Sequence, residues 1–316
     1  MFARPTPRHA HRLAPAAVLA LALLVGPAGS ARGAATITVC PSGCDHTGVG
    51  AAVAAAASGA DIEIHAGTYP AGIVVDKALT IRGAGDSTIL GGGGRTSVVR
   101  VSGKVAVTLE RLQLTGGIGT KFDLEARYGG GVYSGDGATT RIVDCLITGN
   151  TALEGAGVYH NDGTMTIVGT TITANRSDEA GGGVYVNTDA VLTVTDTRID
   201  GNEARHPPEG EFSQANGGGL AVRGRAEMSG GSISGNKAGD WGGGVNNFSR
   251  GELTLRGVEI RGNEAGVEGE GEGRGIWSSA ELALEEVVVA DNVADVVGGG
   301  LFNVGVGTVA LSTFSV

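Results

Sequence analysis

The sequence predicts an all-β solenoid, in which short strands wind into coils that stack on one another. The motif I-x-x-N recurs, with Val289 replacing Ile in the last copy, and its Asn falls at positions 150, 175, 202, 236, 263 and 292. A glycine cluster also recurs, with Ala156 and Arg274 as its departures, at 129–131, 155–157, 181–183, 217–219, 242–244, 273–275 and 298–300. The 58 glycines among 316 residues follow no Gly-x-y period, so they indicate tight turns and not collagen. A repeat of this length indicates a unit that buries its apolar face only against its neighbours.

Residues 1–34 are predicted to be a secretory signal peptide. Arg4, Arg8 and Arg12 precede an apolar run over 13–25, and the small residues around 31–34 offer a cleavage site. The run is too short to span a membrane, and no second apolar segment follows it. We therefore expect a protein that is secreted or exposed at the cell surface, with no transmembrane segment after cleavage.

The chain is acidic, with a formal net charge of −10. Removal of residues 1–34 removes four arginines and no acidic residue, which takes the charge to −14. A surface of this sign repels a phosphate backbone, so nucleic acid is not expected as a partner. The same surface attracts divalent cations.

The segment 35–114 is predicted to form an amino-terminal cap and the first coils. A short strand comes first, then an alanine-rich helix over 47–57 with Thr47 as its N-cap, and then a series of short β-rich runs. A helix at this end covers the sheet edge of the first coil. Cys40 and Cys44, within C-P-S-G-C, are predicted to close a small disulfide loop, since a metal site would need further ligands.

The segment 115–316 is predicted to contain glycine-rich coils, each with three strands and three turns. In the coil that starts at Gly181, Val184 and Val186 point inward and Tyr185 points outward, by the two-residue alternation of a strand. One tight corner of the coils carries residue types that tolerate left-handed backbone angles, namely Asp144, Gly169, Asp196, Gly230 and Gly257. Successive coils are expected to stack at about 4.8 Å, with equivalent side chains above one another.

The recurring asparagines are predicted to form a ladder at another corner. Stacked Asn side chains can hydrogen-bond to backbone groups and to each other, which satisfies polar groups that the corner would otherwise bury unpaired. This structural role is preferred over a role in catalysis.

These features resemble the right-handed parallel β-helix of the pectin lyase-like superfamily. The pattern I-x-x-N, variable loop, G-G-G-[VL]-[YF] is similar to the repeats of the polymorphic outer membrane proteins. A-G-T-Y at 66–69 and L-T-I-R-G at 79–83 resemble the first coils of the superfamily. The resemblance covers nearly all of the mature chain and implies a three-sheet β-helix. It implies no single activity, because the superfamily hosts lyases, hydrolases, esterases, adhesins and inert scaffolds.

An aromatic column is the first candidate binding site. Directly after the glycines, five of seven coils place an outward aromatic residue, namely Tyr133, Tyr159, Tyr185, Trp277 and Phe302. Such a stripe on a flat sheet can stack against sugar rings, so we expect it to bind a polysaccharide or another cell-surface ligand. The alternative is that the rings only stabilise neighbouring coils by cross-strand contact.

The variable loops before the glycines carry the candidate catalytic residues. The long loops emerge from one edge of the solenoid, at 118–128, 203–216 and 263–272. Insertions on one face often mark a binding face. If the protein is an enzyme, Glu179, Arg205 and His206 beside Tyr185 are the candidates for its charged centre. The alternative is that these charges are solvated loop tips.

Three aspartates form a candidate metal site. Asp136, Asp162 and Asp189 fall at the turn after the aromatic position of three consecutive coils, beside His160. Carboxylates about 5 Å apart repel one another unless they are protonated or bridged by a cation, so calcium is a candidate cofactor. Ordinary turn chemistry explains the three residues equally well.

The sequence carries no catalytic motif that can be transferred from a known enzyme. There is no Asp-Asp pair followed by Gly-His-Gly, and A-G-T-Y-P-A at 66–71 lacks the acidic residue that a pectin esterase carries after its tyrosine. The first hypothesis is a secreted or surface-exposed scaffold with an adhesin-like or carbohydrate-binding role, and the alternative is a polysaccharide lyase or hydrolase. Residues 308–316 match only part of a coil, which leaves a longer natural chain and end-to-end self-association as further expectations.

Overall fold

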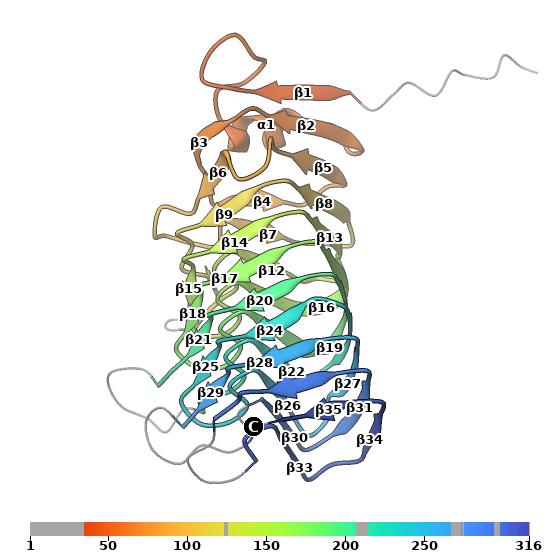
Figure 1. Cartoon of the computed structure of the whole chain (residues 1–316). Helices are drawn as coiled ribbons and strands as arrows, with labels where there is room; N and C mark the ends of the chain where they lie inside the picture. Colours follow the sequence, from red (N-terminus) through yellow and green to blue (C-terminus); the bar gives the residue numbers. More distant parts are fainter. Residues whose placement is uncertain are drawn as a thin grey trace, which may run out of the picture. The chain divides into compact units, whose positions relative to one another are not determined.

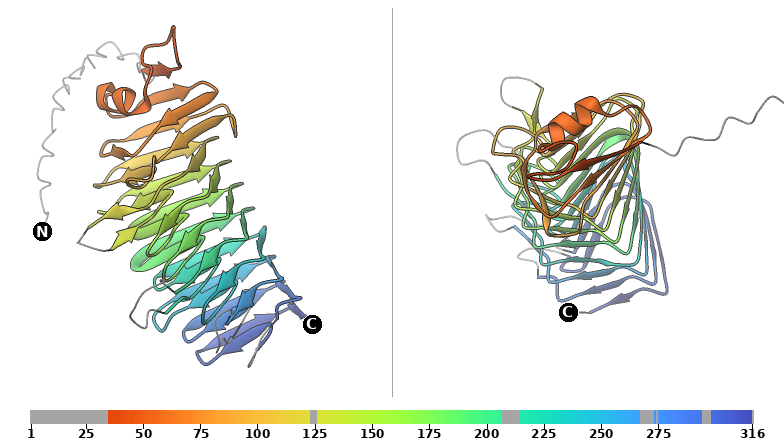
Figure 2. Two further views of the ribbon diagram at one scale, coloured as in Figure 1. Left: turned by 90° about the vertical axis from the view of Figure 1, so that its left-hand side faces the viewer. Right: turned by 90° about the horizontal axis from the view of Figure 1, so that it is seen from above.

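A right-handed parallel β-helix forms the structured part of the chain, as the sequence predicts (Figures 1 and 2). The computed structural model describes residues 35–122, 126–206, 214–266, 273, 275–293 and 298–315. Ala34–Val316 is one compact unit, and the expected signal peptide lies outside the described residues. Within the described ranges, no helix is long and apolar enough to cross a lipid bilayer.

Each complete coil contributes one strand to each of three parallel sheets, which we number in the order in which the chain enters them after a glycine cluster. The first sheet contains β4 (Ile73–Val75), β7 (Val99–Val101), β12 (Val132–Ser134), the first parts of β16 (Val158–Val168) and β19 (Val184–Thr195), β22 (Leu220–Val222), β26 (Val245–Asn247), β30 (Ile276–Ser278) and β33 (Leu301–Asn303). The second sheet contains β1 (Thr36–Val39), β2 (Ala60–Ile64), β5 (Leu79–Arg82), β8 (Ala106–Glu110), β13 (Thr139–Val143), the last parts of β16 and β19, β23 (Arg225–Ser229), β27 (Glu252–Arg256), β31 (Glu281–Glu285) and β34 (Gly307–Ala310). The third sheet contains β3 (Gly67–Pro70), β6 (Thr88–Gly91), β9 (Gln113–Thr115), β14 (Leu146–Thr148), β17 (Thr171–Thr173), β20 (Arg198–Asp200), β24 (Ser232–Ser234), β28 (Glu259–Arg261), β32 (Val288–Ala290) and β35 (Thr313–Phe314).

Two smaller sheets were not predicted from the sequence. A two-residue strand follows the ladder asparagine in five coils, as β15 (Thr151–Ala152), β18 (Arg176–Ser177), β21 (Glu203–Ala204), β25 (Lys237–Ala238) and β29 (Glu264–Ala265). The insertion at 118–128 contains an antiparallel pair, β10 (Thr120–Lys121) and β11 (Arg127–Tyr128). The short strands give each of these loops a fixed start.

The coils stack in register around a continuous apolar core. Val132 pairs with Val158 and Val158 with Val184, and all three are fully buried. Val184 and Val186 belong to the core, whereas Tyr185 belongs to a separate cluster outside it, as the strand alternation predicts. The apolar side chains of one coil pack against those of the next, which excludes water from the centre of the coils and stabilises the stack.

The asparagine ladder is confirmed. The Nδ2 group of Asn175 donates to Oδ1 of Asn202 at 3.0 Å, and the Asn175 backbone N–H donates to the same oxygen at 3.1 Å. Nδ2 also donates to the Ile147 carbonyl oxygen at 2.9 Å. Equivalent bonds occur at Asn150, Asn202, Asn236 and Asn263. Each rung therefore satisfies its own buried polar atoms and those of the coil beside it.

The tight corner between the second and third sheets has the predicted left-handed backbone. The φ angles are 50° at Asp144, 58° at Gly169, 47° at Asp196, 66° at Gly230 and 59° at Gly257. Glycine and aspartate reach this region at low cost, which explains why these residue types recur at this corner.

The amino-terminal end carries α1 (Val49–Ala55), the one helix among the residues that the structure describes, which lies across the first coils (Figure 2). Its N-cap is Gly48 and no side chain caps it, so the prediction that Thr47 is the N-cap was wrong by one residue. Cys40 and Cys44 form the predicted disulfide.

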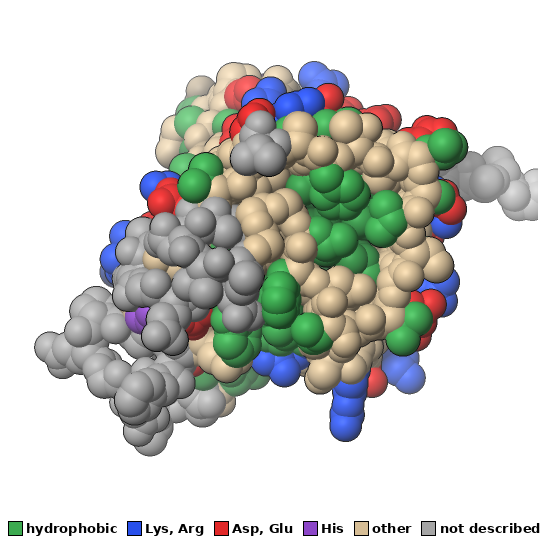
Figure 3. Space-filling view, turned by 60° about the horizontal axis from the view of Figure 1, so that its bottom comes forward, with side chains coloured by type: hydrophobic (Ala, Val, Ile, Leu, Met, Phe, Trp, Pro, Cys, Tyr) green, Lys and Arg blue, Asp and Glu red, His purple; other side chains and the backbone are tan. Residues whose placement is uncertain are grey.

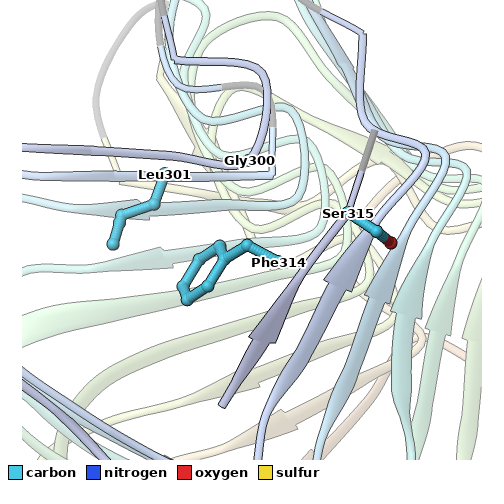
Figure 4. Close-up of a pocket in the computed structure, with 4 residues that line it drawn as sticks. All are labelled: Gly300, Leu301, Phe314 and Ser315. Carbon is cyan, nitrogen blue, oxygen red and sulfur yellow. The ribbon is translucent and has the colours of Figure 1, made fainter.

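The last coil exposes the interior of the β-helix. Figure 3 shows hydrophobic side chains gathered at this end, and Figure 4 shows the depression lined by Gly300, Leu301, Phe314 and Ser315. Leu301 and Phe314 continue the core columns of Ile276 and Val289, and no further coil covers them among the described residues. We therefore assign this depression to the core of the last described coil and not to the functional site.

Candidate functional site

The outer face of the first sheet carries one continuous column of side chains, which we call the outer column. The pairing register places its members next to one another in the order Val74, Arg100, Tyr133, Tyr159, Tyr185, Ala221, Asn246, Trp277 and Phe302. The loops before the glycine clusters border the column on one side, and the turns after the first-sheet strands border it on the other. The alignment of the repeats made from the sequence is thus confirmed at this position.

The three tyrosines of the outer column stack on one another and are buried. The ring centroids of Tyr133 and Tyr159 lie 5.7 Å apart and those of Tyr159 and Tyr185 lie 5.0 Å apart, with nearly parallel planes. Two rings of the insertion pack on this stack, Phe122 at 4.8 Å from Tyr133 and Tyr128 at 4.9 Å from Tyr159. Each tyrosine is only 3–6% exposed. The structure therefore shows cross-strand packing of these rings. Their stacking against a sugar stays a prediction, and it would require Phe122 and Tyr128 to move away.

Arg100 extends this packed region toward the amino-terminal coils. Its Cζ lies 5.2 Å from the ring centroid of Phe122 and 5.8 Å from that of Tyr133. A guanidinium at this distance is attracted by the ring faces. The contact adds a second attachment of the insertion to the outer column.

A pair of carboxylates borders the outer column beside Tyr185. Glu154 and Glu179 come from the loops of consecutive coils, and the Glu179 N–H donates to the carbonyl oxygen of the residue before Glu154 at 2.9 Å. The Tyr185 hydroxyl interacts electrostatically with the Glu154 carboxylate and with the Arg223 guanidinium. Arg223 comes from the opposite border, where its Cζ lies 4.2 Å over the ring of Phe248. Three consecutive coils therefore bring two acids, a hydroxyl and a cation together, and we call this the Glu154 site.

Burial raises the pKa of both carboxyl groups. Desolvation is the main cause for Glu154, repulsion from Glu179 adds to it, and the pKa rises to about 7 although Arg223 and Tyr185 oppose the shift. Desolvation is also the main cause for Glu179, whose pKa is raised further by Asp178 and held back by Arg223. Burial raises the pKa of Tyr185 well above its usual range. Near neutral pH the site therefore holds a carboxyl group that can give up a proton and a phenol that stays protonated.

This arrangement is suited to general acid–base catalysis. Two neighbouring carboxyl groups with different environments can divide the roles of acid and base, and a pKa near 7 is well matched to an acid that works at neutral pH. Glycoside hydrolases commonly use such a pair of carboxyl groups. Arg223 supplies a positive charge that can face an acidic group on a ligand.

Of the three predicted catalytic residues, Glu179 is the one that interacts with other members of the Glu154 site, namely Glu154 and Arg223. Arg205 pairs with Asp178, with Nε 3.4 Å from Oδ1. His206 pairs with Asp240, with Nε2 3.2 Å from Oδ1. Each therefore has an acidic partner other than Glu179, and a role of either in catalysis stays a prediction.

Of the three aspartates of the predicted calcium site, Asp136 lies at a turn. Asp162 and Asp189 lie within β16 and β19, which continue without a break from the first sheet to the second, so the prediction of a turn was wrong for these two. Asp162 pairs in register with Asp189, and its carboxylate accepts hydrogen bonds from the Gly137 N–H and from the Asn161 amide. Asp136 accepts a hydrogen bond from the Ser102 hydroxyl at 2.6 Å. Hydrogen bonds within the protein therefore satisfy the carboxylates of Asp136 and Asp162. Calcium binding stays a prediction.

One group of potential metal ligands does converge elsewhere in the described part of the chain. It comprises Cys40, Cys44 and His65, whose ligand atoms lie within 4.8 Å of one another. Since the two cysteines are joined in the disulfide, their sulfur atoms are not available as thiolates.

Trp277 and Phe302, the remaining aromatic residues of the predicted column, are half-buried. Trp277 stacks with Trp241, with ring centroids 5.2 Å apart and an interplanar angle of 11°. Between this pair and the tyrosines lie Ala221 and Asn246, both fully buried. The outer column is therefore divided into a tyrosine part and a tryptophan part.

Three residues were not predicted from the sequence as site residues, namely Glu154, Arg223 and Asn246. A signal for Glu154 was present, because it follows Asn150 by four residues, as Glu179 follows Asn175. Arg223 follows its first-sheet strand at the position where the two preceding coils carry Asn161 and Asn187. Both signals depend on comparing equivalent positions of consecutive coils.

Comparisons with known proteins support the fold. No protein-family model matches the chain, and no curated protein matches it by sequence. It is similar to pectin methylesterase from carrot, at 13% identity over 88% of this chain and 82% of that chain, with a TM-score of 0.51. It is also similar to ORF18 of Geobacillus virus E2, at 12% identity over 81% of this chain and 54% of that chain, with a TM-score of 0.50. Pectate lyase Pel9A matches at 13% identity over 88% and 79% of the two chains, with a TM-score of 0.48.

At these identities the likeness shows the fold alone. The chain has the right-handed parallel β-helix found in pectin lyase-like proteins, which confirms the resemblance drawn from its repeats. A shared β-helix does not transfer an activity, because this fold carries many functions. The function must therefore be argued from the Glu154 site.

Proposed function

We propose that the protein is an enzyme that cleaves a polysaccharide, with Glu154 as general acid and Glu179 as its partner carboxylate. The observation that carries this proposal is the Glu154 site itself: two carboxyl groups of consecutive coils stand beside Tyr185 and Arg223. The carrot neighbour is a pectin methylesterase by name, so a polysaccharide substrate is compatible with the fold. This favours the enzyme over the scaffold as the first hypothesis.

In the proposed reaction the protonated Glu154 gives its proton to the glycosidic oxygen that leaves. The Glu179 carboxylate accepts a proton from the attacking water, or attacks the sugar carbon itself, and the distance between the two carboxyl groups decides which. Tyr185 stands beside Glu154, and its interaction with the Glu154 carboxylate lowers the pKa of that group. Arg223 faces the same site and favours a substrate with a carboxylate near the cleaved bond.

The test is an assay of the mature protein against neutral and acidic polysaccharides, with and without calcium. New reducing ends would show hydrolysis, and the ultraviolet absorbance of unsaturated uronates would show elimination by a lyase. We expect Glu154→Gln to lower kcat by about 10²–10⁴-fold. Glu259→Gln, at an exposed position of β28, is the matched control and should leave kcat unchanged. Cleavage that continues unchanged in both Glu154→Gln and Glu179→Gln would refute the proposal.

A carbohydrate-binding or adhesin-like scaffold is the second candidate function. The observation that favours a scaffold is the closed tyrosine stack, which packs three consecutive coils against one another. Under this proposal the protein is exported by residues 1–34 and acts at the cell surface, with end-to-end association between copies. Retention of a polysaccharide without any cleavage in the same assay would favour the scaffold.

A further inference from the structure

The outer column changes its chemistry after Tyr185. The next three rungs are Ala221, Asn246 and Trp277, which pair in register with one another. The tyrosines before them fill the column with stacked rings, whereas Ala221 contributes only a methyl group. The packing that explains the first half of the column therefore does not explain the second half.

Asn246 buries polar atoms that have no partner. It is fully buried, and neither its Nδ2 nor its Oδ1 has a hydrogen-bond partner among the described residues. The Nε1 group of Trp277, on the neighbouring rung, is also buried and unpartnered within the described ranges. Buried donors and acceptors are nearly always paired in native proteins, so an unpaired set on adjacent rungs calls for an explanation.

The asparagine ladder shows which hydrogen bonds a structural asparagine makes in this chain. Every internal rung of the asparagine ladder uses Nδ2, Oδ1 and the backbone N–H in hydrogen bonds, as at Asn202. Asn246 stands instead on the face of a strand where three other coils carry tyrosine. Leaving its amide unpaired costs stability, and an apolar side chain at this position would avoid that cost. A structural role therefore does not account for asparagine at position 246.

Aromatic rings stand beside the unpaired amide. Trp241 stacks with Trp277, and the Trp241 backbone N–H donates to Oδ1 of Asn216 at 3.1 Å, which fixes the start of its side chain. A sugar ring is recognised by aromatic faces that pack on its C–H groups and by a few placed polar groups that meet its hydroxyls. The Trp pair and the Asn246 amide supply both parts.

We propose that Trp241, Asn246 and Trp277 form a subsite for a neutral, hydroxyl-rich sugar unit. The unpaired atoms are an uncharged amide donor, an amide acceptor and an indole N–H, which match hydroxyl groups and not an ionised group. Because Asn246 is fully buried, a ligand can enter only if the covering side chains rearrange, and the stacked tryptophans would report that change.

The inference rests on the proposed action on polysaccharide, and it names a second contact for the same substrate. Asn246 lies two rungs beyond Tyr185 along the outer column, which is about 10 Å at the spacing of parallel strands. A polysaccharide bound along the sheet would therefore meet the Glu154 site and the tryptophan subsite with different sugar units. Binding at the subsite can be measured without any cleavage.

Trp241 and Trp277 are the two tryptophans of the chain, so intrinsic tryptophan fluorescence reports on this subsite. The experiment titrates the Glu154→Gln protein with hexasaccharides of β-1,4-linked glucose, mannose and xylose, and with hexagalacturonate as the acidic comparison. We expect a saturable fluorescence change with a neutral hexasaccharide. Adding Asn246→Val should weaken its affinity by about tenfold or more, because the amide bonds are lost. The same change should raise the thermal unfolding midpoint.

Two further variants separate binding from folding. Thr193→Val, at an exposed position on the second-sheet part of β19, is the matched control and should change neither affinity nor midpoint. Trp277→Phe keeps an aromatic ring but removes Nε1, so it should weaken binding while the protein stays folded. If Asn246→Val lowers the midpoint, Trp277→Phe decides, and unchanged affinity in that variant would overturn the proposal.

The remaining outcomes are equally decisive. No response to any neutral hexasaccharide, or a response to hexagalacturonate alone, would overturn the neutral-sugar subsite. Binding in the Glu154→Gln protein without cleavage by the wild type would keep the subsite and remove the enzyme. Cleavage by the wild type without any fluorescence response would keep the enzyme and remove the subsite.

Discussion

The asparagine ladder and the outer column are both built by stacking equivalent positions of successive coils, yet they differ in what they repeat. The ladder repeats one residue six times, and its side chains are at most 7% exposed and hydrogen-bonded to one another or to backbone. The outer column begins with Val74, continues with a cation and three tyrosines, and then carries Ala221, Asn246 and Trp277. In this molecule, positions that carry the same residue in successive coils stabilise the fold. Positions at which the residue changes from coil to coil are the candidates for a function.

The Glu154 site follows the same rule. Glu154 and Glu179 repeat for two coils, and on the opposite border Arg223 replaces the Asn161 and Asn187 of the preceding coils. The site forms where these changes coincide beside Tyr185. Four measurements test this difference between the ladder and the outer column, and each successive measurement has a smaller expected effect.

The largest effect is expected inside the tyrosine part of the outer column. Tyr159→Ala removes the middle ring of the stack and leaves a cavity under Tyr128, so the free energy of unfolding should fall by about 3–5 kcal/mol. Tyr159→Phe keeps the ring and is the control. Urea unfolding followed by circular dichroism measures both. A loss below about 1 kcal/mol in Tyr159→Ala would mean that the stack does not serve packing.

The next effect is expected in the ladder. Asn202→Ala removes the bonds that its amide makes to Asn236 and to the Ile172 carbonyl, and it leaves the Asn175 N–H unpaired. We expect the free energy of unfolding to fall by about 2–4 kcal/mol. Asn303→Ala, at an exposed asparagine of β33, should cost no more than about 0.5 kcal/mol. Equal losses in the two variants, measured in urea, would show that the ladder adds nothing specific.

A smaller effect links the Glu154 site to pH. The folded-state pKa of Glu154 is raised to about 7 from a usual value of 4.5, so the folded protein binds more protons than the unfolded chain between these values. Stability should therefore fall by about 2–3 kcal/mol as the pH rises from about 4.5 to 7. Glu154→Gln should flatten this slope in urea unfolding at a series of pH values. If the free energy of unfolding of Glu154→Gln depends on pH as strongly as that of the wild type, a group other than Glu154 causes the pH dependence.

The smallest effect has the opposite sign. Asn246→Val removes two unpaired buried polar atoms, so the free energy of unfolding should rise by about 1 kcal/mol. Chemical unfolding of the single variant measures it. A decrease of the same size would make Asn246 resemble a ladder asparagine and would weaken the distinction between the two columns.

Much of the fold was predictable because it depends on local rules that repeat. The positions of the ladder asparagines, the left-handed corner at Asp144 and Asp196, and the inward side chains of Val184 and Val186 all follow from the period and from strand alternation. The two-residue strands after the ladder were missed, because a pair of backbone hydrogen bonds needs no particular side chain.

Less of the candidate site was predictable, because it depends on contacts between coils. The period places Tyr133 and Tyr159 on the outer face, but it does not show that Phe122 and Tyr128 of an insertion fold back over them. Glu179 was named from its charge. Its interaction with Arg223 joins opposite borders of the column, and the spacing within one coil does not reveal it.

The pH dependence of kcat/KM for polysaccharide cleavage tests the central claim most directly, because Glu154 must be protonated to act as the acid. Between about pH 4 and pH 9 we predict a bell-shaped profile whose basic limb lies near pH 7, the value to which burial raises the pKa of Glu154. Glu154→Gln should lower the rate by at least about 10²-fold and remove that limb. An absence of cleavage for every polysaccharide tested, or a basic limb that persists in Glu154→Gln, would contradict the account.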